Sequence, residues 1–315
     1  MKDLFTSSMI NRKAWLRTDE SRVRGWLEQA GTRVIVWFDG QLMVQPDGTG
    51  YFSWHDLSGF RDLLSSPVYL GQHERKEYFT CRLKLWDAHF DGLKLIKLRQ
   101  ACRQFDDFHL SLLFHAQGLI NWHQNHAFCP ACGSAMQMVQ AGHARACSNE
   151  QCGKLQYPKL DPAVIFSIVN QQQAKDRILL ARKPGWDEYR YSVVAGFVEP
   201  GETLEDSVKR EAYEETGLQV DQVEYVASQP WPFPDALMLG FRCTTVQQDI
   251  RLIDRELESA RWFYADEIES AIALGEFKMP FGFSIAWHLI DDWFKQQKGY
   301  SLRRLEAKSG ASDRV

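Results

Sequence analysis

One stretch of this sequence, GFVEPGETLEDSVKREAYEETGL at residues 196–218, restricts the possible fold more than any other. Leu204, Val208 and Ala212 recur within it at four-residue intervals, which predicts a helix with one apolar face. Gly217 follows the last turn of that helix, and glycine is the residue most often found just beyond a helix end. The stretch therefore predicts a loop, an amphipathic helix and an abrupt end.

The predicted helix also carries three closely spaced glutamates. Glu211 and Glu215 are four residues apart and share one face, and Glu214 lies beside them. Like charges in this arrangement repel each other by roughly 0.2–0.5 kcal/mol per pair, which destabilises a helix without a ligand. A divalent cation would reverse this effect, because carboxylate oxygen is the ligand that Mg²⁺ prefers. The pattern therefore indicates a metal-binding helix.

The order of residue types across this stretch resembles the complete Nudix box. A glycine is followed by five residues, Glu202, seven residues, Arg210-Glu211 and then the run 214–218 (EETGL). The one mild departure is Ala212, which is smaller than the aliphatic residue usual at that position. A solvated acidic helix is the alternative, but so long a fixed pattern is far more restrictive than a short motif. Nudix enzymes hydrolyse a nucleoside diphosphate linked to another group, so the resemblance implies a hydrolase.

Four cysteines in two close pairs form the second informative feature. Fourteen residues, a length suited to a hairpin, separate Cys129 and Cys132 from Cys147 and Cys152. Four thiolates around one point predict tetrahedral Zn²⁺ at about 2.3 Å from each sulfur. Two disulfides are the alternative, and a cytosolic compartment disfavours them. With four protein ligands and no open position, the zinc is expected to be structural.

Composition and the N-terminal segment set limits on the class of protein. A net charge of −4 at pH 7 argues against a chain whose main task is to grip a nucleic-acid backbone. No window approaches the roughly 18–20 consecutive apolar residues of a membrane span. The first residues contain no apolar run of signal-peptide length. We therefore expect a cytoplasmic protein with no membrane partner.

At 315 residues the chain is expected to hold two domains and a smaller element between them. The predicted parts are an N-terminal domain at 1–124, a zinc ribbon at 125–158, a hydrolase domain at 159–300 and a polar, disordered tail at 301–315. The N-terminal domain is expected to be mostly β and closed by helices. Its strand patterns lie at 34–38, 42–44, 51–54, 68–71 and 77–84, and helical periodicity runs from 93 to 121.

The C-terminal part shows strand patterns on both sides of the acidic helix. Strands are expected at 163–169, 177–181, 191–195, 222–228, 237–245 and 258–264, and a second helix at 280–297. This order predicts a mixed sheet with helices on both faces, an α/β/α sandwich. The fold class expected for the whole chain is therefore α+β.

A proline-rich segment at 228–234, SQPWPFP, follows the acidic helix. Proline fixes φ, so the segment is expected to be stiff and extended rather than helical. Trp231 and Phe233 held outward on it would form a platform on which planar rings stack. A buried aromatic loop is the commoner outcome for such segments, but the position shortly after the metal helix favours the platform.

Together these features resemble the NADH pyrophosphatases, the NAD(H) diphosphatase branch of the Nudix superfamily. That family has a four-cysteine zinc ribbon, a Tyr-Pro-x-x-Asp-Pro segment, the Nudix box and an SQPWPFP array, and all four occur here in that order, with the second at 157–162. The resemblance implies a Nudix-like N-terminal domain, a homodimer, and Mg²⁺- or Mn²⁺-dependent hydrolysis of NADH or NAD⁺ to NMN(H) and AMP. Removal of NAD caps from RNA would use the same bond and site. The chain departs from the family at Ala236, where serine is usual, and at Lys159, where arginine is frequent.

The resemblance also implies roles for single residues. Glu211, Glu215, Glu256 and the carbonyl of Ala195 would ligate the divalent ion, and Glu215 or Glu214 would accept a proton from the attacking water. An ion pair between Glu202 and Arg210 would fix the helix, since a buried carboxylate is costly without a partner. The substrate-contacting positions would be Arg99, Tyr157, Gln229, Pro230, Trp231, Pro232, Phe233, Pro234, Asp235, Ala236 and Ala286.

Two other functions stay open on the sequence alone. One is a Nudix hydrolase of ADP-ribose, another dinucleotide or a sugar nucleotide. The other is a ribbon-containing nucleic-acid-binding protein with a vestigial hydrolase site, which the intact glutamates and the negative net charge disfavour. Because the chain contains no G-x-G-x-x-G segment, a dinucleotide would be held by stacking and metals rather than by a Rossmann fold.

Overall fold

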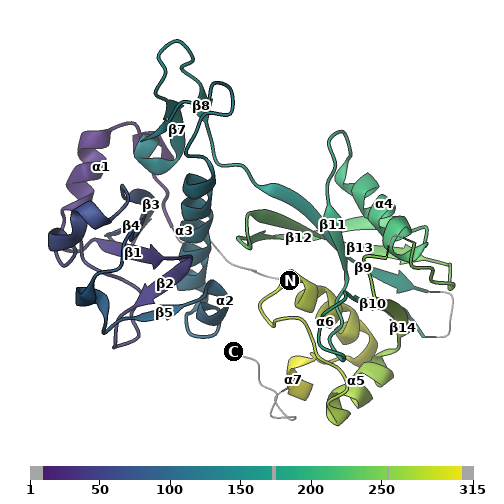
Figure 1. The fold of residues 1–315 in the computed structure, drawn as a ribbon. Coiled ribbons are helices and arrows are strands. Elements are labelled where there is room, and N and C mark those ends of the chain that lie inside the picture. The colour runs from purple at the N-terminus through teal and green to yellow at the C-terminus, as the bar shows by residue number, and fades with distance from the viewer. Residues whose placement is uncertain (1–9, 172–174, 254, 307–315) are drawn as a thin grey trace. The chain divides into compact units, whose positions relative to one another are not determined.

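The computed structural model describes residues 10–171, 175–253 and 255–306. The described residues divide into two compact units, each with its own sheet (Figure 1). Residues 10–160 and 232–235 form the N-terminal unit, and the remaining described residues form the C-terminal unit. No helix in these ranges is long and apolar enough to cross a membrane.

The N-terminal unit is built on a five-stranded sheet with the order β3-β4-β1-β2-β5. Its strands are β1 (Arg33–Phe38), β2 (Gln41–Val44), β3 (Val68–His73), β4 (Lys76–Arg82) and β5 (Lys94–Ile96). β1 and β4 are parallel, and the other neighbours are antiparallel. The helices are α1 (Glu20–Leu27), α2 (Leu98–Ala101) and α3 (Asp107–Asn125), with short 3₁₀ segments η2 (Ala14–Leu16), η3 (Ser58–Leu63), η4 (Ala88–Phe90) and η5 (Gln140–Gly142). The prediction of a mostly β domain with helices is confirmed.

Central strand β1 shows why this sheet forms the core of its unit. Its residues Val34, Ile35, Val36 and Trp37 are all buried, so apolar side chains on both faces are covered. Helix α3 packs on β3 and β4.

Two details of the N-terminal unit differ from the sequence-based prediction. Residues 51–54 form no strand and contribute only an isolated bridge between Phe52 and Val34. Residues 94–96 are an edge strand rather than a helix, because they pair with β2 while Leu95 packs against the core. Tertiary pairing overrides helical periodicity in so short a segment.

The cysteine-containing segment adds a small antiparallel sheet of β6 (Met136–Val139), β7 (Ala144–Cys147) and β8 (Leu155–Gln156) to the same unit. The turn between β6 and β7 is hydrogen-bonded to strand β3 of the five-stranded sheet and packs against it. His143 Nε2 donates to the carbonyl of Tyr69 (2.7 Å), and burial lowers the pKa of His143 to about 4, so the ring is neutral. Gly142 has φ +91°, and a Cβ there would lie 2.6 Å from a methyl of Val68. The turn and strand β3 are therefore in direct contact.

The C-terminal unit contains a six-stranded mixed sheet with the order β12-β13-β9-β10-β14, and β11 also pairs with β9. The strands are β9 (Asp161–Asn170), β10 (Arg177–Arg182), β11 (Val194–Phe197), β12 (Asp221–Trp231), β13 (Ala236–Thr245) and β14 (Ser259–Phe263). β9 and β13 are parallel, and the other pairs are antiparallel. The predicted mixed sheet is confirmed. β12 extends three residues beyond its predicted end and so includes the first part of the proline-rich segment.

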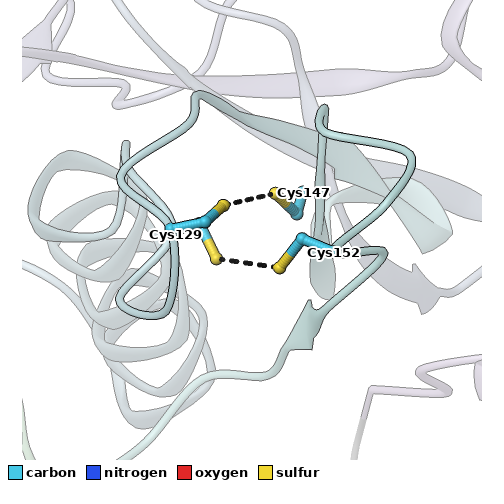
Figure 2. Close-up of side chains that lie close together, drawn as sticks. Cys129, Cys147 and Cys152 are labelled. Atoms are coloured by element: carbon cyan, nitrogen blue, oxygen red, sulfur yellow. Dashed lines mark hydrogen bonds between the residues drawn. The ribbon is translucent and has the colours of Figure 1, made fainter.

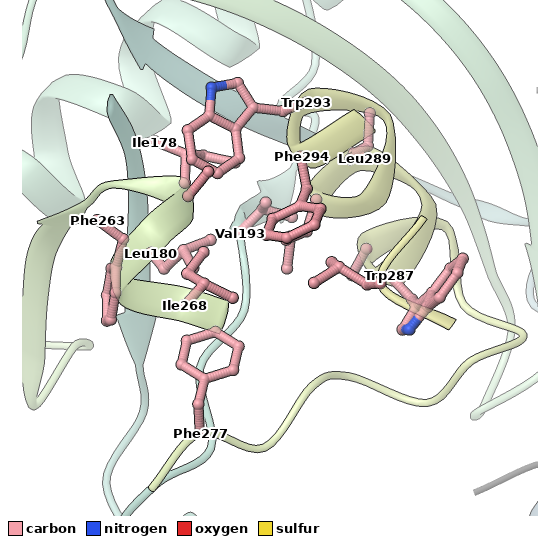
Figure 3. Close-up of a cluster of buried hydrophobic side chains, with 14 of the residues drawn as sticks. Ile178, Leu180, Val193, Phe263, Ile268, Phe277, Trp287, Leu289, Trp293 and Phe294 are labelled. Carbon is pink, nitrogen blue, oxygen red and sulfur yellow. The ribbon is translucent and has the colours of Figure 1, made fainter. Parts of the chain in front are cut away.

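Helices cover both faces of this sheet. They are α4 (Leu204–Thr216), α5 (Ala265–Leu274), α6 (Ile285–Lys298) and α7 (Arg303–Glu306). Along β9, Val164 and Phe166 pack with Val208 of α4, whereas Ile165 packs with the cluster formed by α5 and α6. This alternation is what a strand buried on both faces requires. Figure 3 shows the second cluster, where Trp293 and Phe294 of α6 lie among Ile178 and Leu180 of β10.

The segment predicted to be a disordered tail begins with ordered residues. Leu302 is fully buried, and its backbone N–H donates to Asp291 Oδ1 of α6 (2.7 Å). The rest of that predicted tail, residues 307–315, lies outside the described residues.

Candidate functional site

Helix α4 forms where the acidic stretch predicts it. Thr203 caps its N-terminus by accepting a hydrogen bond from the backbone N–H of Asp206 (3.2 Å). Gly217 ends it in the left-handed conformation with φ 72°. Val208 and Ala212 are fully buried against the sheet, so the orientation of the helix about its axis is fixed. The face carrying Glu211 and Glu215 follows from that orientation.

Glu211 lies directly against strand β11. A Cβ built on Gly196 would fall 1.9 Å from Cδ of Glu211 and 2.0 Å from its Oε1, so any side chain at Gly196 would occupy the place of the carboxylate. Burial raises the pKa of Glu211 above its usual value, against the opposing effect of Arg210. Ala195, whose carbonyl is a predicted ligand, is the neighbouring residue of the same strand. Gly196 therefore makes room for Glu211 beside this backbone.

Arg210 ties the acidic side chains of α4 to the preceding loop. Its Nε lies 2.6 Å from Glu202 Oε1, and its Nη1 lies 2.8 Å from Glu211 and 3.0 Å from Glu214. Its Nη2 donates to the carbonyl of Phe197 (2.8 Å). The hydrogen bond from Arg210 is the largest cause that lowers the pKa of Glu202 to about 2. A planar guanidinium can satisfy so many acceptors at once, which an ammonium cannot.

Glu215 is the most deeply buried of the candidate acids, with its side chain only 1% exposed. Lys183, directly after β10, places its Nζ 3.6 Å from Glu215 Oε1 and 3.2 Å from Glu256 Oε2. Burial alone would lower the pKa of Lys183, but Glu215 and Glu256 outweigh it and raise the pKa above the usual value. One cation is therefore held between a buried and an exposed carboxylate.

These side chains suit a divalent cation. The donor set is carboxylate and carbonyl oxygen, which Mg²⁺ and Mn²⁺ prefer. The point occupied by Lys183 Nζ shows that oxygens of Glu215 and Glu256 face a common position. Within the described ranges, however, the carboxylates form no group of three that could hold a metal ion in this arrangement. Glu211 is engaged by Arg210, and Glu215 and Glu256 by Lys183, so the acids gather around cations rather than around one point.

The proline-rich segment contributes one aromatic ring, Trp231, to the same unit. Trp231 is half-buried at the end of β12 and stacks on Phe283, with ring centroids 5.9 Å apart and planes at 26°. Phe283 stacks in turn on Phe281 (5.6 Å, 17°). Gln229 is completely buried; it donates to the carbonyl of Phe283 (2.9 Å) and accepts from the N–H of Ile285 (2.8 Å). Gln229 therefore holds the segment that carries Phe283 at the start of α6.

The remaining predicted substrate positions are distributed over both units. In the C-terminal unit, Pro230 is exposed, and Ala236 and Ala286 are buried. In the N-terminal unit, the guanidinium of Arg99 lies over the ring of Phe233 (4.4 Å), and Pro234 accepts a hydrogen bond from Asn121 (3.0 Å). Three other predicted positions also group with the N-terminal unit: Pro232 is buried, Asp235 is half-buried and Tyr157 is exposed.

The four predicted zinc ligands meet at one point. Their sulfur atoms all lie within 4.8 Å of one another. The sulfurs of Cys129 and Cys152 are 3.8 Å apart, and those of Cys132 and Cys147 are 3.4 Å apart. Figure 2 shows Cys129, Cys147 and Cys152 gathered close together. Tetrahedral zinc with bonds of about 2.3 Å places its sulfurs at nearly these separations. Hydrogen bonds from Ser134 lower the pKa of Cys132 to about 6, which favours the thiolate. The residues therefore fit a closed zinc site.

Three family models match the chain. They are a NUDIX domain at residues 159–281, an NADH pyrophosphatase-like rudimentary NUDIX domain at 31–122 and an NADH pyrophosphatase zinc ribbon domain at 124–157. This chain belongs to the Nudix family. Within that family it has the three parts found in NADH pyrophosphatase-type members, and the ribbon match identifies the four-cysteine cluster as a zinc site.

Three relatives of this Nudix protein carry descriptions of their own. The human "NAD-capped RNA hydrolase NUDT12" is 35% identical over 62% of this chain and 44% of its own length. The Mycobacterium bovis "NAD-capped RNA hydrolase NudC" is 38% identical over 63% of this chain and 64% of its own. The Arabidopsis thaliana "Nudix hydrolase 19, chloroplastic" is 40% identical over 54% and 39%. The chain thus spans less than two thirds of the length of the relatives it matches.

A lysine and two phenylalanines of this Nudix domain lie at the candidate site although the sequence patterns did not predict them there. Lys183 lies beside the glutamates only because β9, β10 and α4 pack as they do, and its neighbours in the sequence form no motif. Phe281 and Phe283 belong to a PFGF segment at 280–283, inside the range predicted to be helical, whereas α6 begins only at Ile285. The aromatic spacing of this segment was a readable signal. Their stacking on Trp231 requires the contact between β12 and α6, which only the fold provides.

Proposed function

We propose that this Nudix protein hydrolyses the pyrophosphate bond of NADH or NAD⁺ with Mg²⁺ or Mn²⁺, giving NMN(H) and AMP. We propose further that the same site removes NAD caps from RNA. The observation that carries the proposal is that one domain combines the glutamate face of α4 with the aromatic stack Trp231–Phe283–Phe281. The human and mycobacterial relatives are both named NAD-capped RNA hydrolases, which supports NAD and NAD-capped RNA as the substrate class.

A divalent ion held by Glu211, Glu215, Glu256 and the Ala195 carbonyl would neutralise the pyrophosphate oxygens and acidify a coordinated water. Glu215 is the preferred proton acceptor. Glu214, the alternative, is exposed and already accepts a hydrogen bond from Arg210. As the water oxygen bonds to phosphorus, its proton passes to the glutamate and the bond from that phosphorus to the bridging oxygen breaks.

Other residues of this domain position the reacting groups. Arg210 fixes the Glu211 carboxylate against Gly196 by binding Glu202, Glu211 and a backbone carbonyl together. Trp231 offers a ring face for a planar substrate group, and Gln229 supports it indirectly through the backbone of Phe283. In this proposal the Arg99 and Tyr157 side chains remain substrate contacts supplied by the N-terminal unit.

Compartment and assembly complete the proposal. The cysteine cluster needs reduced thiols, as the cytosol provides, so we place the protein there. A homodimer is proposed from the resemblance to the NADH pyrophosphatases. Sedimentation analysis at micromolar concentration should give a mass of two chains; a single-chain mass across that range would remove the dimer from the proposal.

Product analysis tests the function directly. The purified protein is incubated with NADH, NAD⁺, ADP-ribose and NAD-capped RNA, with Mg²⁺ and with Mn²⁺, and products are separated by chromatography. NMN(H) and AMP from NAD(H), and a 5′-monophosphate RNA with NMN from capped RNA, are expected. Preferential cleavage of ADP-ribose with NADH left intact would reject the proposal in favour of a different nucleoside diphosphate substrate.

A pair of substitutions on one helix tests the proton acceptor. Glu215→Gln should lower kcat by roughly 10²–10⁴-fold, because it removes both a ligand charge and the proton acceptor. Glu205→Gln is the matched control, since Glu205 is exposed on the same helix and belongs to no proposed contact. Loss of kcat in the control, or metal-dependent turnover retained by Glu215→Gln, would contradict the assigned role.

A further inference from the structure

The N-terminal unit contains a pocket that plays no part in the proposed hydrolysis. Its volume is about 440 Å³, within the range of about 300–1,000 Å³ typical of small-molecule sites. It lies among the residues that follow η3, the end of β4, helix α3 and the ribbon strands β6 and β7, all within one unit. A volume of this size accommodates one nucleotide.

The lining of the pocket combines two kinds of side chain. Leu64, Val68, Ile120 and Met138 are apolar, and all of them except Met138 are buried. Arg82, Lys84 and Arg145 are cationic. None of the described lining residues is acidic. A ligand that matches this lining has a planar apolar part and a negative charge.

The hydrogen bonds of these cations go to uncharged groups. Arg145 donates to the carbonyls of His123 (2.8 Å) and Met136 (3.1 Å), and its Nη1 lies 3.1 Å from His123 Nδ1. Its Nε is buried and has no hydrogen-bond partner in the described part of the chain. Lys84 donates only to the backbone carbonyl of Asp62 (3.1 Å). Within the described part of the chain, Arg145 and Lys84 are therefore anchored by backbone carbonyls and not by a carboxylate.

Fixed cations without a counter-charge are the usual basis of phosphate recognition, because charge-assisted hydrogen bonds to phosphate are roughly twice as strong as neutral ones. The half-buried guanidinium of Arg145 is oriented in advance by two backbone carbonyls, so little side-chain entropy is lost on binding. Exposed Ser66 and Gln124 add hydrogen-bonding groups at the same pocket, as a ribose would need.

We propose that this pocket binds a nucleoside phosphate, with the phosphate at Arg82, Lys84 and Arg145 and the base against the apolar side chains. The nucleotide could be free or could be one unit of an RNA strand, and both have the same chemistry. The inference does not depend on the hydrolase activity, because no residue of the pocket belongs to the glutamate site.

Binding is measured with the full-length, zinc-loaded protein in buffer without Mg²⁺, Mn²⁺ or a chelator, so that the glutamate site is not loaded and the ribbon keeps its zinc. The probes are AMP, followed by calorimetry, and a fluorescently labelled uncapped RNA of twelve nucleotides, followed by anisotropy. The double variant Arg82→Gln/Lys84→Gln should weaken binding of the recognised probe by about tenfold or more, since it removes two charged partners. Circular dichroism and zinc content should match the unmodified protein and so show that the variant is folded.

The matched control is Lys76→Gln/Lys94→Gln, which removes the same charge from exposed positions of the same sheet outside the pocket. If Arg82→Gln/Lys84→Gln binds only AMP more weakly, the ligand is a free nucleotide. If it binds only the RNA more weakly, the ligand is an RNA strand. Either result supports the proposal. Equal affinities in the two double variants for both probes would overturn it. As a second measurement, 8-azido-AMP should label peptides from 64–84 or 120–145, and labelling confined to other peptides would also overturn it.

The two proposals fail separately. If Glu215→Gln retains hydrolysis, the assigned catalytic role is wrong, but AMP or RNA binding without Mg²⁺ or Mn²⁺ and its loss in Arg82→Gln/Lys84→Gln are unaffected. If that loss is absent while NADH is cleaved, only the pocket is rejected.

Discussion

The zinc ribbon and the acidic face of the Nudix domain differ in whether their ligand side chains already lie together before an ion binds. In the ribbon, four cysteine sulfurs already lie within 4.8 Å of one another. In the Nudix domain, the described carboxylates form no such group, and Arg210 and Lys183 stand among them. Hydrogen bonds between the cysteine sulfurs keep them close together, whereas carboxylates at pH 7 repel one another and need cations between them. We infer that the zinc site is assembled as part of the fold. At the proposed divalent site, the glutamates would have to leave Arg210 and Lys183 in order to bind the ion.

The largest effect is expected from breaking the preassembled site. Cys147→Ser removes a buried ligand and should abolish stoichiometric zinc binding. Because zinc binding contributes folding free energy directly, the N-terminal unit should lose about 3 kcal/mol or more of stability. Atomic emission and thermal unfolding measure the two effects. Cys102→Ala, a half-buried cysteine outside the cluster, serves as control, and one zinc per chain in Cys147→Ser would contradict the assignment.

A smaller effect is expected from crowding the carboxylate site. Gly196→Ala would place a methyl group 1.9 Å from Cδ of Glu211, so the carboxylate must move away from β11. The affinity for Mn²⁺, measured by electron paramagnetic resonance, should fall by about tenfold, as is typical when a ligand loses its orientation. Gly118→Ala provides the comparison, because a Cβ there meets nothing within 4 Å. Unchanged Mn²⁺ affinity in Gly196→Ala would show that Glu211 is not a ligand.

The smallest effect tests the exchange of partners directly. Lys183→Met removes the cation beside buried Glu215, so the zinc-loaded protein without Mg²⁺ or Mn²⁺ should lose about 1–2 kcal/mol of unfolding free energy, discounted because Lys183 is partly exposed. Mg²⁺ should then raise the melting temperature more than in the unmodified protein, because no ammonium competes for Glu215 and Glu256. Calorimetric melting with and without Mg²⁺ measures both changes.

Lys209→Met, on the exposed side of α4, is the control for this substitution. If Mg²⁺ stabilises Lys183→Met and Lys209→Met equally, Lys183 does not hold the place of the ion. A Lys183→Met variant more stable than the unmodified protein in the absence of Mg²⁺ and Mn²⁺ would likewise show that the ammonium does not compensate Glu215.

The same contrast explains how much could be predicted from the sequence. Helix α4, the cysteine cluster and the mixed sheet follow from local patterns: four-residue apolar spacing, paired cysteines and strand runs. The position of Lys183 beside the glutamates and the stacking of Phe283 on Trp231 could not be predicted, because the partners come from other strands and helices. Gln229 was predicted to line the substrate pocket; the structure places its amide in hydrogen bonds to backbone, a contact that no residue pattern specifies. Long-range pairing also made residues 94–96 a strand.

The contact of Gly142 and His143 with β3 has a practical consequence for dissecting this protein. A fragment that stopped before the ribbon would leave the methyl groups of Val68 without their covering backbone and the Tyr69 carbonyl without its donor. Such a truncated product should be prone to aggregation during expression. A fragment containing only the first half of the chain should therefore end after β8 at Gln156. The cysteine hairpin is then retained and continues to cover strand β3.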